Sequence, residues 1–512
     1  MAIATYELYI DWAADGFGAA DSIDDITDYW LWGQGISLSR GRDRASQLTG
    51  RSVAGRLAAV LDNGDDRFSS FNTGSPLTGL VLPGRKVLFR ATFATVVYNL
   101  WGGFLLTIEP SPQAKGPAIA RLSAAGPIAW LNDPKRTVSV PMQTNILTGA
   151  AITVVLDEAG WPAADRTLDD GETTMTRWWQ GDASPLTGLR KIEDTDAGFL
   201  AESGDRKVVF EDRHHRLASP HTVSQATYSD ASGAALNYYA IEQIDPWDEI
   251  YNRFEASVTI YTVGSLAVLW TLAQTGANSP SIPPGDSAIF WARYPNPDSA
   301  TDAKSVDAWT TPVATTDVTA NSQADGMGSD LTASIGIAVS KFANDMKITL
   351  TNNHATLPAY ITLLQARGTP VTASDPAKVR SEDATSQAAY GLRTYPNPAE
   401  FVPSVAEGQN WADLHKSIYK DPLPGLKVTL YGNLSDAQMV ECLTRQISDR
   451  VTVVANGDAG LGIDEDFFVE AIEHRITGGN HFTTFTLSPA ERYSDFWVLG
   501  VSLLGQQTRL VY

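Results

Sequence analysis

Short runs in which apolar residues occupy every second position recur along most of this chain. The first run, ATYELYIDWA, places Tyr6, Leu8, Ile10 and Trp12 on one face, which is the period of two of a half-buried β-strand. Similar runs include RKVLFRATF, DMKITLTNN and HFTTFTLSPA, and clusters of Gly, Pro, Asn and Asp separate them. These turn formers at short intervals are typical of β-sandwiches and barrels. The pattern predicts a mainly β fold with few helices.

Helical spacing appears in only a few segments. Apolar residues in TNILTGAAITVVLDEAGWP and SPLTGLRKIEDTDAGFLAE fall at helical intervals, and a Gly-Trp-Pro stop or a glycine follows each segment. WADLHKSIY is a third helix candidate, and VAGRLAAVLDN reads as helix-like or as a short turn. These patterns predict an α+β module within an otherwise β-rich chain.

The chain of 512 residues, 43% of them hydrophobic, is long enough for about three or four domains. We expect a first β-barrel block at 1–130, completed by about 205–255, and an α+β insertion module at 131–204. A β-sandwich-like accessory domain follows at 256–372, then a second barrel block at 373–492 and a C-terminal extension at 493–512. The fold class is therefore mainly β with an α+β module, multidomain, with two barrels and an accessory sandwich.

The formal net charge of −21 argues against nucleic-acid binding, because phosphate binding needs clustered Lys and Arg. It is compatible with DNA that slides past an acidic wall, and with plain solubility. The N-terminal segment carries acids where a signal peptide needs basic residues, and no run approaches a membrane span. The single cysteine, Cys442, fits synthesis in a reducing cytoplasm. We expect no export by the general pathway and no stable membrane insertion.

The segment LDNGDDRFSSFNTGSPLTGLVLPGRKV holds the best acidic cluster, Asp62, Asp65 and Asp66. A calcium hand needs glycine at its sixth position and glutamate at its twelfth, but here these positions are Arg67 and Thr73. The acids are therefore predicted to form a turn and cap backbone N–H groups. The rest of the segment is interpreted as a rigid connector at a barrel rim, which Phe68 and Phe71 anchor to their own domain or to a neighbouring subunit.

Two pairs of histidines are candidate metal ligands. A turn at Gly478-Gly479 would make His474 and His481 diagonal neighbours on one face, but no third ligand is evident nearby. His214 and His215 would point to opposite faces of a strand. No metal site and no cofactor site is predicted, and the glycine-rich segments lack the Lys and Ser/Thr order of a phosphate loop.

Motifs of nucleophilic catalysis are missing from the sequence. It has no G-x-S-x-G and no H-E-x-x-H, and the neighbours of Cys442 suggest a buried helix position. No catalytic residue is assigned, and we expect the chain not to be an enzyme.

Four stretches of the sequence, in the same order along the chain, resemble one family, the tail-tip or baseplate hub proteins of tailed bacteriophages. These proteins are related in fold to the trimeric hub of contractile tails. AGRLAAVLDNGDDRFSSFNTGSPLTGLVLPGRKV is similar to a turn and strand entry of that family. ILTGAAITVVLDEAGWPAADRTLDDGETTMTRWW with GDRKVVFEDRHHRL resembles its α+β insertion. The family's second barrel looks like two further stretches of this chain. They are PAYITLLQARGTPV with DATSQAAYGLRTY, and then ISDRVTVVANGDAGLGIDEDFFVEAIEHRITGGNHFTTFTLSPA.

The resemblance implies a structural virion protein at a tail tip, made in the bacterial host. Two hub-type barrels per chain would alternate around a homotrimer, matching the sixfold tail tube to threefold distal components. The implied partners are other copies of the chain, tail tube and distal tail proteins, the tape measure protein and a central fibre or tip protein. DNA would pass through the channel without specific binding, and part of the acidic charge is expected to line that channel. The resemblance is equally compatible with a phage, a tail-like bacteriocin and a gene-transfer agent.

Two alternatives remain open at this point. In the first, the central sandwich is a host-surface carbohydrate-binding module, as its aromatic residues suggest: Trp270, Phe290, Trp291, Tyr294 and Trp309. In the second, the chain is a tail-associated cell-wall hydrolase, against which the missing catalytic motifs argue.

Overall fold

A computed structural model describes residues 2–17, 23–44, 48, 50–111, 118–244, 247–272, 278–295, 303–422, 424–457, 460–493, 496–497 and 509–510. The chain is mainly β and multidomain, as predicted, and its core is divided among five buried clusters. Most of the extension predicted at 493–512 lies outside the described residues.

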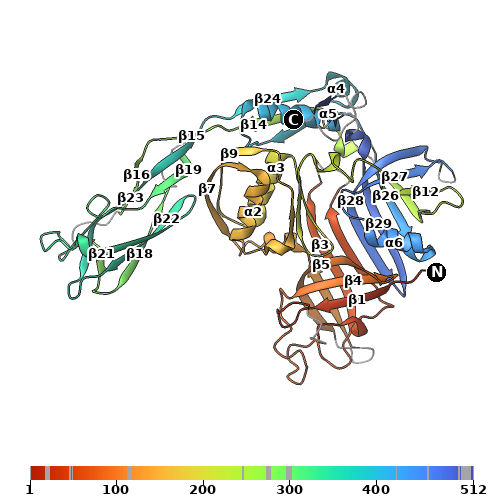
Figure 1. The fold of residues 1–512 in the computed structure, drawn as a ribbon, viewed down its shortest axis with the longest axis horizontal. Helices are drawn as coiled ribbons and strands as arrows, with labels where there is room; N and C mark the ends of the chain where they lie inside the picture. Colours follow the sequence, from red (N-terminus) through yellow and green to blue (C-terminus); the bar gives the residue numbers. More distant parts are fainter. Residues whose placement is uncertain are drawn as a thin grey trace.

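The first β block occupies the lower part of Figure 1. Its strands pair in the order β1, β4, β5, β6, β3, β2, with antiparallel neighbours. Their bounds are β1 (Thr5–Ile10), β2 (Ile36–Arg42), β3 (Ser52–Asp62), β4 (Lys86–Phe93), β5 (Val96–Ser111) and β6 (Ile119–Ala125). The alternating residues Tyr6, Leu8, Ile10 and Trp12 all lie in its core, as the sequence predicted.

The segment 53–61, expected as helix-like or as a short turn, is strand β3. Its residues Leu57, Ala59 and Leu61 alternate into the core, and β2 and β6 pair with it on its two sides. That expectation was wrong because pairing on both edges and alternate burial determine the conformation here, whereas local spacing does not.

The second β block continues the same sheet. After β2, the order runs β28, β29, β26, β13, and β27 pairs with β28 and β12. The bounds are β12 (Thr227–Ser229), β13 (Ala240–Ile244), β26 (Gly425–Tyr431), β27 (Arg450–Ala455), β28 (Ile463–Thr477) and β29 (Asn480–Pro489). Helix α6 (Asp436–Thr444) packs nearby. The two blocks are thus halves of one 12-stranded sheet.

This topology corrects the expectation that residues 205–255 complete the first block. Strands β12 and β13 pair with β27 and β26 of the second block. Tyr228 of β12 is buried among Val428, Val453 and Phe485, so burial draws these strands to the second core.

The insertion module lies between the two blocks and the arm in Figure 1. Helices α2 (Thr148–Glu158) and α3 (Pro185–Asp196) confirm two of the predicted helices; they pack together beside the pair β7 (Val138–Leu147) and β9 (Thr174–Ala183). A small sheet adds β8 (Arg166–Leu168), β10 (Phe199–Glu202) and β11 (Val208–Glu211), so the module runs beyond 204. Helix α1 (Pro127–Leu131) precedes it.

The accessory domain extends as an arm at the left of Figure 1. Its long strand β23 (Ala359–Ala373) pairs with β15 (Tyr261–Val263), β16 (Ala267–Thr271), β17 (Ser281–Ile282), β19 (Ala303–Thr310) and β20 (Val318–Asn321). A second sheet contains β18 (Ser287–Arg293), β22 (Asp345–Asn352) and β21 (Ile335–Lys341). Both sheets contribute to one core, so this domain is a sandwich.

A separate small module corrects the boundary at 373. Strand β14 (Arg253–Val258) pairs with β24 (Ala377–Glu382) and β25 (Thr394–Asn397), and the predicted helix α5 (Val405–Tyr419) packs on β14 and β24. Helix α4 (Ala384–Tyr390) follows β24. Phe254, Trp411 and Tyr419 share its core. The sheet of the second block therefore resumes only at β26.

Candidate functional sites and interface surfaces

The loop at 61–87 is a chain of turns. The Asp62 carboxylate accepts a hydrogen bond from the backbone N–H of Gly64 at 2.9 Å, and that of Asp65 accepts one from Arg67 at 3.2 Å. Asn63 accepts from the Phe68 N–H at 3.0 Å. These bonds confirm the prediction of a turn with capped backbone groups for Asp62 and Asp65.

The two phenylalanines of this loop have opposite environments. Phe68 is buried against Trp12 and Tyr29 of its own block. Phe71 is 94% exposed. Only Phe68 therefore anchors the loop to its own domain, and Phe71 presents an apolar ring to whatever lies outside the chain.

The hairpin of β28 and β29 brings His474 and His481 together, as the Gly478-Gly479 turn predicted. The His474 Nδ1 and His481 Nε2 atoms are 3.0 Å apart, and Nδ1 of His481 lies 2.9 Å from the Tyr6 hydroxyl. Both rings are buried. Burial lowers the pKa of both imidazoles, to about 3 for His481. The pair is a neutral hydrogen-bonded link between β1 and the second block.

His214 and His215 do not lie on a strand, which corrects the sequence interpretation. β11 ends at Glu211, and a 3-10 helix spans His215–Leu217. The Nδ1 atom of His215 lies 2.8 Å from the Asp169 carboxylate, and that of His214 lies 3.0 Å from Glu172. Each ring thus lies within hydrogen-bond distance of a nearby carboxylate.

A group of three acids was missed by the sequence analysis. Asp11, Asp15 and Asp24 bring one carboxylate oxygen each within 4.8 Å of one another. Asp11 accepts from the N–H groups of Asp15 and Gly16, and Asp24 from that of Trp12. The group was missed because Asp24 lies on a returning segment that only the fold brings beside Asp11. These hydrogen bonds indicate that the three acids shape the loop after β1.

Buried charges lie where the halves of the sheet meet, and we call this place the seam. β2 pairs with β28 from Ile36–Ile476 to Gly41–Ala471. The Glu470 carboxylate accepts two hydrogen bonds from Arg216, at 2.7 and 3.0 Å, and lies 3.1 Å from Nε of Arg42. All three side chains are almost fully buried. Although burial alone would raise the Glu470 pKa, the two guanidinium groups lower it below its usual value. The seam is therefore closed by a desolvated ion triad.

Glycine is required at one point of the seam. Gly41 has φ +112°, and a Cβ there would lie 2.4 Å from the Glu470 carbonyl oxygen and 2.6 Å from the Ala471 Cα. Any side chain would push the two strands apart.

A second buried carboxylate fastens the insertion module to the first block. Glu202 of β10 accepts hydrogen bonds from the N–H groups of Gly55 at 2.8 Å and Ile128 at 2.5 Å. Burial raises its pKa to about 7. The Glu202 side chain thus connects the module both to β3 and to the start of α1.

Eight consecutive strands of the large sheet, from β5 to β13, share one surface that we call the polar face. Many residues of this face are small and polar, as the registers show, and one aromatic cluster of Tyr239, Tyr431 and Phe482 lies among them. The small and polar residues include Ser37, Ser39, Ala58, Thr107, Ser123, Thr429 and Thr484. Its charged side chains balance, with four basic and four acidic residues: Arg56, Arg121, Lys427, Arg475, Asp62, Glu109, Glu242 and Glu473. The acidic excess of the chain lies elsewhere.

Both ends of the polar face are open strand edges. β13 pairs with β26 on one side only. The second half of β5 pairs with β6, and beyond Leu105 no described residue accepts or donates a backbone hydrogen bond on its other side. Because the eight strands alternate in direction, β13 and β5 point in opposite directions. The edges of two copies can therefore pair in antiparallel fashion.

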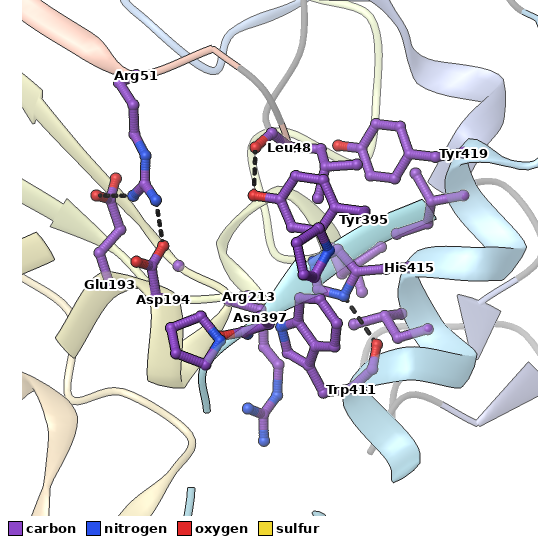
Figure 2. A pocket seen from close by; sticks show the side chains of 17 residues that line it. Leu48, Arg51, Glu193, Asp194, Arg213, Tyr395, Asn397, Trp411, His415 and Tyr419 are labelled. Atoms are coloured by element: carbon purple, nitrogen blue, oxygen red, sulfur yellow. Dashed lines mark hydrogen bonds and ion pairs between the residues drawn. The ribbon is translucent and has the colours of Figure 1, made fainter. Parts of the chain in front are cut away.

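A small cavity of about 150 Å³ lies where the loop before β3, helix α3 and helix α5 meet (Figure 2). Arg51 points to Glu193 and Asp194, at 2.8 and 2.5 Å, and the Tyr395 hydroxyl donates to the Leu48 carbonyl. His415 donates through Nδ1 to the carbonyl of Trp411 at 2.8 Å, and burial lowers its pKa to about 4. These contacts join three modules, so we assign the cavity to their packing.

The remaining sequence candidates divide by exposure. Cys442 is buried in α6, and burial raises its pKa to about 12, which makes it a poor nucleophile. Of the five sandwich aromatics, Trp309 belongs to the buried core, while Trp270, Phe290 and Tyr294 pack partly buried against it. Trp291 is 54% exposed. The ring set proposed as a glycan platform therefore reduces to Trp291.

No described helix combines the length and the apolar composition needed to span a bilayer. No family model matches the sequence, and no curated protein matches it. Among solved structures, the tail protein from Neisseria meningitidis MC58 shares 10% identity and a TM-score of 0.50, covering 95% of this chain and 98% of its own. This chain has the fold of that tail protein. The resemblance to tail proteins is thus confirmed at the level of the fold.

A second structure has nearly the same extent. The 43 kDa tail protein of prophage MuSo2 from Shewanella oneidensis shares 12% identity, with a TM-score of 0.49 over 96% of this chain and 99% of that chain.

Proposed function

We propose that this chain is a structural virion protein of a phage-like tail tip, which assembles as a homotrimeric hub ring around the DNA exit channel. The observation that carries the proposal is the polar face with its two open antiparallel edges. An open edge is a template for another strand. Pairing β13 of one copy with β5 of the next closes three copies into a ring.

The size of such a ring suits a DNA channel. At a strand spacing of about 4.8 Å, three sets of eight strands form a circle about 37 Å across between backbones, and strand tilt widens it. Small side chains on the polar face leave room for a duplex inside.

The near-neutral charge of the polar face suits the passage of DNA without tight binding. Binding DNA needs clustered basic residues that release counterions, and here Lys427 lies opposite Glu242, and Arg121 opposite Glu109, on neighbouring strands. For the channel we therefore propose a near-neutral wall, in place of the acidic lining expected from the net charge. The chain acts through shape and contacts and not through catalysis. Tail tube, tape measure, and distal fibre or tip proteins are its proposed partners.

Crosslinking tests the edge pairing directly. Cysteines replace Glu242 on β13 and Glu109 on β5, and a short bis-maleimide is added to the double variant. Cys442 is buried, so it does not compete. We expect covalent dimers and trimers. The control joins Glu109→Cys with Met327→Cys in the arm, where Met327 is 83% exposed, and should stay monomeric. Equal yields from both pairs, or no species larger than a monomer from the edge pair, would refute the ring.

A further inference from the structure

Three of the seven histidines of the chain lie in one short segment, residues 212–226, which we call the histidine linker. It joins strand β11 of the insertion module to strand β12 of the second block. It also reaches the seam, because Arg216 in its 3-10 helix pairs with Glu470 at 2.7 Å. Near its other end, the N–H group of Gln225 donates to the carbonyl of Arg450 at 2.8 Å. The histidine linker therefore connects the module, the seam and the second block.

Two rings of the histidine linker face each other. The ring centroids of His215 and His221 are 4.7 Å apart, and the ring planes are tilted by 35°. The Nδ1 atom of His215 lies 2.8 Å from the Asp169 carboxylate, and its Nε2 atom lies 3.6 Å from that of Glu211. His221 is 9% exposed, and its Nδ1 atom has no hydrogen-bond partner among the described residues. One ring is thus held by two carboxylates, and the other is buried beside it.

Charged groups from four segments surround this pair of rings. Asp169 follows β8, Glu211 ends β11 and Asp449 precedes β27. Asp449 favours protonation of His221, whereas Arg216 of the histidine linker opposes protonation of both rings. The carboxylates come from the insertion module and from the second block, so the charge of the pair acts on the contact between these two parts.

The surroundings favour one proton on the pair. Although burial alone would lower it, the hydrogen bond with Asp169 and the charge of Glu211 raise the pKa of His215. Burial, and then the charge of His215, lower the pKa of His221. Two imidazolium rings this close repel each other, and the buried Nδ1 atom of His221 offers a second proton no acceptor. Near the ordinary histidine pKa of 6.5, the pair therefore carries a single proton, on His215.

We propose that His215 and His221 form a proton-operated clasp: with one proton on the pair the histidine linker holds the insertion module to the second block, and with two protons or none it loosens. As the pH rises through the raised pKa of His215, the imidazolium between its two carboxylates is lost, and so is the stability it contributes. As the pH falls below 6.5 toward the lowered pKa of His221, the stability contributed by the neutral ring is lost. The clasp lies within one chain and does not depend on the ring of three copies.

Hydrogen exchange of the full chain, corrected at each pH for the exchange rate of an unstructured peptide, tests the clasp. Protection of peptides within 212–226 should be highest near about pH 6.5. It should fall by about tenfold toward both about pH 5 and about pH 8. A peptide of β22 in the arm is the internal reference and should keep the same protection throughout.

Single variants separate the two sides of this profile. His221→Gln removes the site of the second proton, so it should abolish the fall at acidic pH and keep the fall at alkaline pH. His215→Gln removes the ion bridge, so it should abolish the alkaline fall and weaken the acidic one, because His221 then titrates without a charged neighbour. His214→Gln is the matched control, since this ring lies in the same linker but pairs with Glu172 at 3.0 Å. It should follow the unaltered chain.

Carbon-13 labelling of the histidine rings gives a second readout that needs no variant to fold. The rings of His215 and His221 should titrate on opposite sides of about pH 6.5, and titration of both at one pH would overturn the clasp. Flat protection of the histidine linker across the pH range would overturn it as well. So would a profile of His214→Gln that departs from the unaltered chain as much as that of His221→Gln does.

Discussion

The seam at β2 and β28 buries its charges, whereas the joint between the insertion module and the sandwich leaves its ion pair partly exposed to water. Arg42, Arg216 and Glu470 are at most 3% exposed, but Arg177 and Asp307 are 27% and 23% exposed. Breaking a buried triad leaves a buried charge without compensation, whereas a partly exposed pair contributes little to the free energy of folding. The seam is therefore expected to contribute more to stability than the joint.

The largest effect is expected at the centre of the seam. Glu470→Ala leaves two buried guanidinium groups without their carboxylate, so the free energy of unfolding should fall by about 3–5 kcal/mol. Urea denaturation measures this change. Glu7→Ala, which removes a partly exposed partner of Arg90, is the control and should cost at most about 1 kcal/mol. Equal losses in both variants would contradict the account of the seam.

Gly41→Ala tests the seam through its backbone. Left-handed strain of about 1–2 kcal/mol adds to overpacking of about 1–3 kcal/mol, so thermal unfolding should show a loss of about 2–5 kcal/mol. Gly33→Ala is the matched control, because a Cβ there meets nothing within 4 Å. If both variants unfold at the same temperature, the strands at the seam are less tightly apposed than described.

The pH dependence of stability should also localise to this region, because His474 pairs with Leu38 across the seam. An unfolded imidazole takes up a proton near pH 6.5, whereas His481 stays neutral in the fold until about pH 3. Stability contributed by the neutral rings is therefore complete above pH 6.5 and is lost as the pH falls toward 3.

His481→Gln removes one titrating ring. Between pH 6 and 4.5, its loss of stability should be smaller than that of the unaltered chain by about 2 kcal/mol. Urea denaturation at the two pH values checks this difference. His354→Gln, in the arm, should follow the unaltered chain. Identical pH profiles for all three proteins would show that the buried pair is not neutral.

The smallest effect is expected at the joint. Asp307→Ala removes the partner of Arg177 and should lower the free energy of unfolding by at most about 1 kcal/mol. The same variant should show faster hydrogen exchange in β19 than the unaltered chain. A loss as large as that of Glu470→Ala would erase the distinction between seam and joint.

Local patterns predicted much of this fold. The alternation of Tyr6, Leu8 and Ile10 and the glycine stops after α2 and α3 act within a few residues, so the sequence reveals them. The Gly478-Gly479 turn likewise predicted the contact of His474 with His481. Strand β3 was misread because two distant neighbours determine its conformation.

The parts that escaped prediction depend on long-range pairing. Glu470, Arg42 and Arg216 come from three separate segments, and nothing near any of them in the sequence marks its partners. The open edges of β5 and β13 exist only once the strand order is known.

The most direct test of the central claim is the native mass of the purified chain, alone and with the tail tube protein. The account predicts a species of three copies of the 55.2 kDa chain, formed alone or on addition of the tube protein. That species should be lost when proline in β13 blocks the open edge, as in Gln243→Pro. A chain that remains a monomer under both conditions would contradict the hub ring.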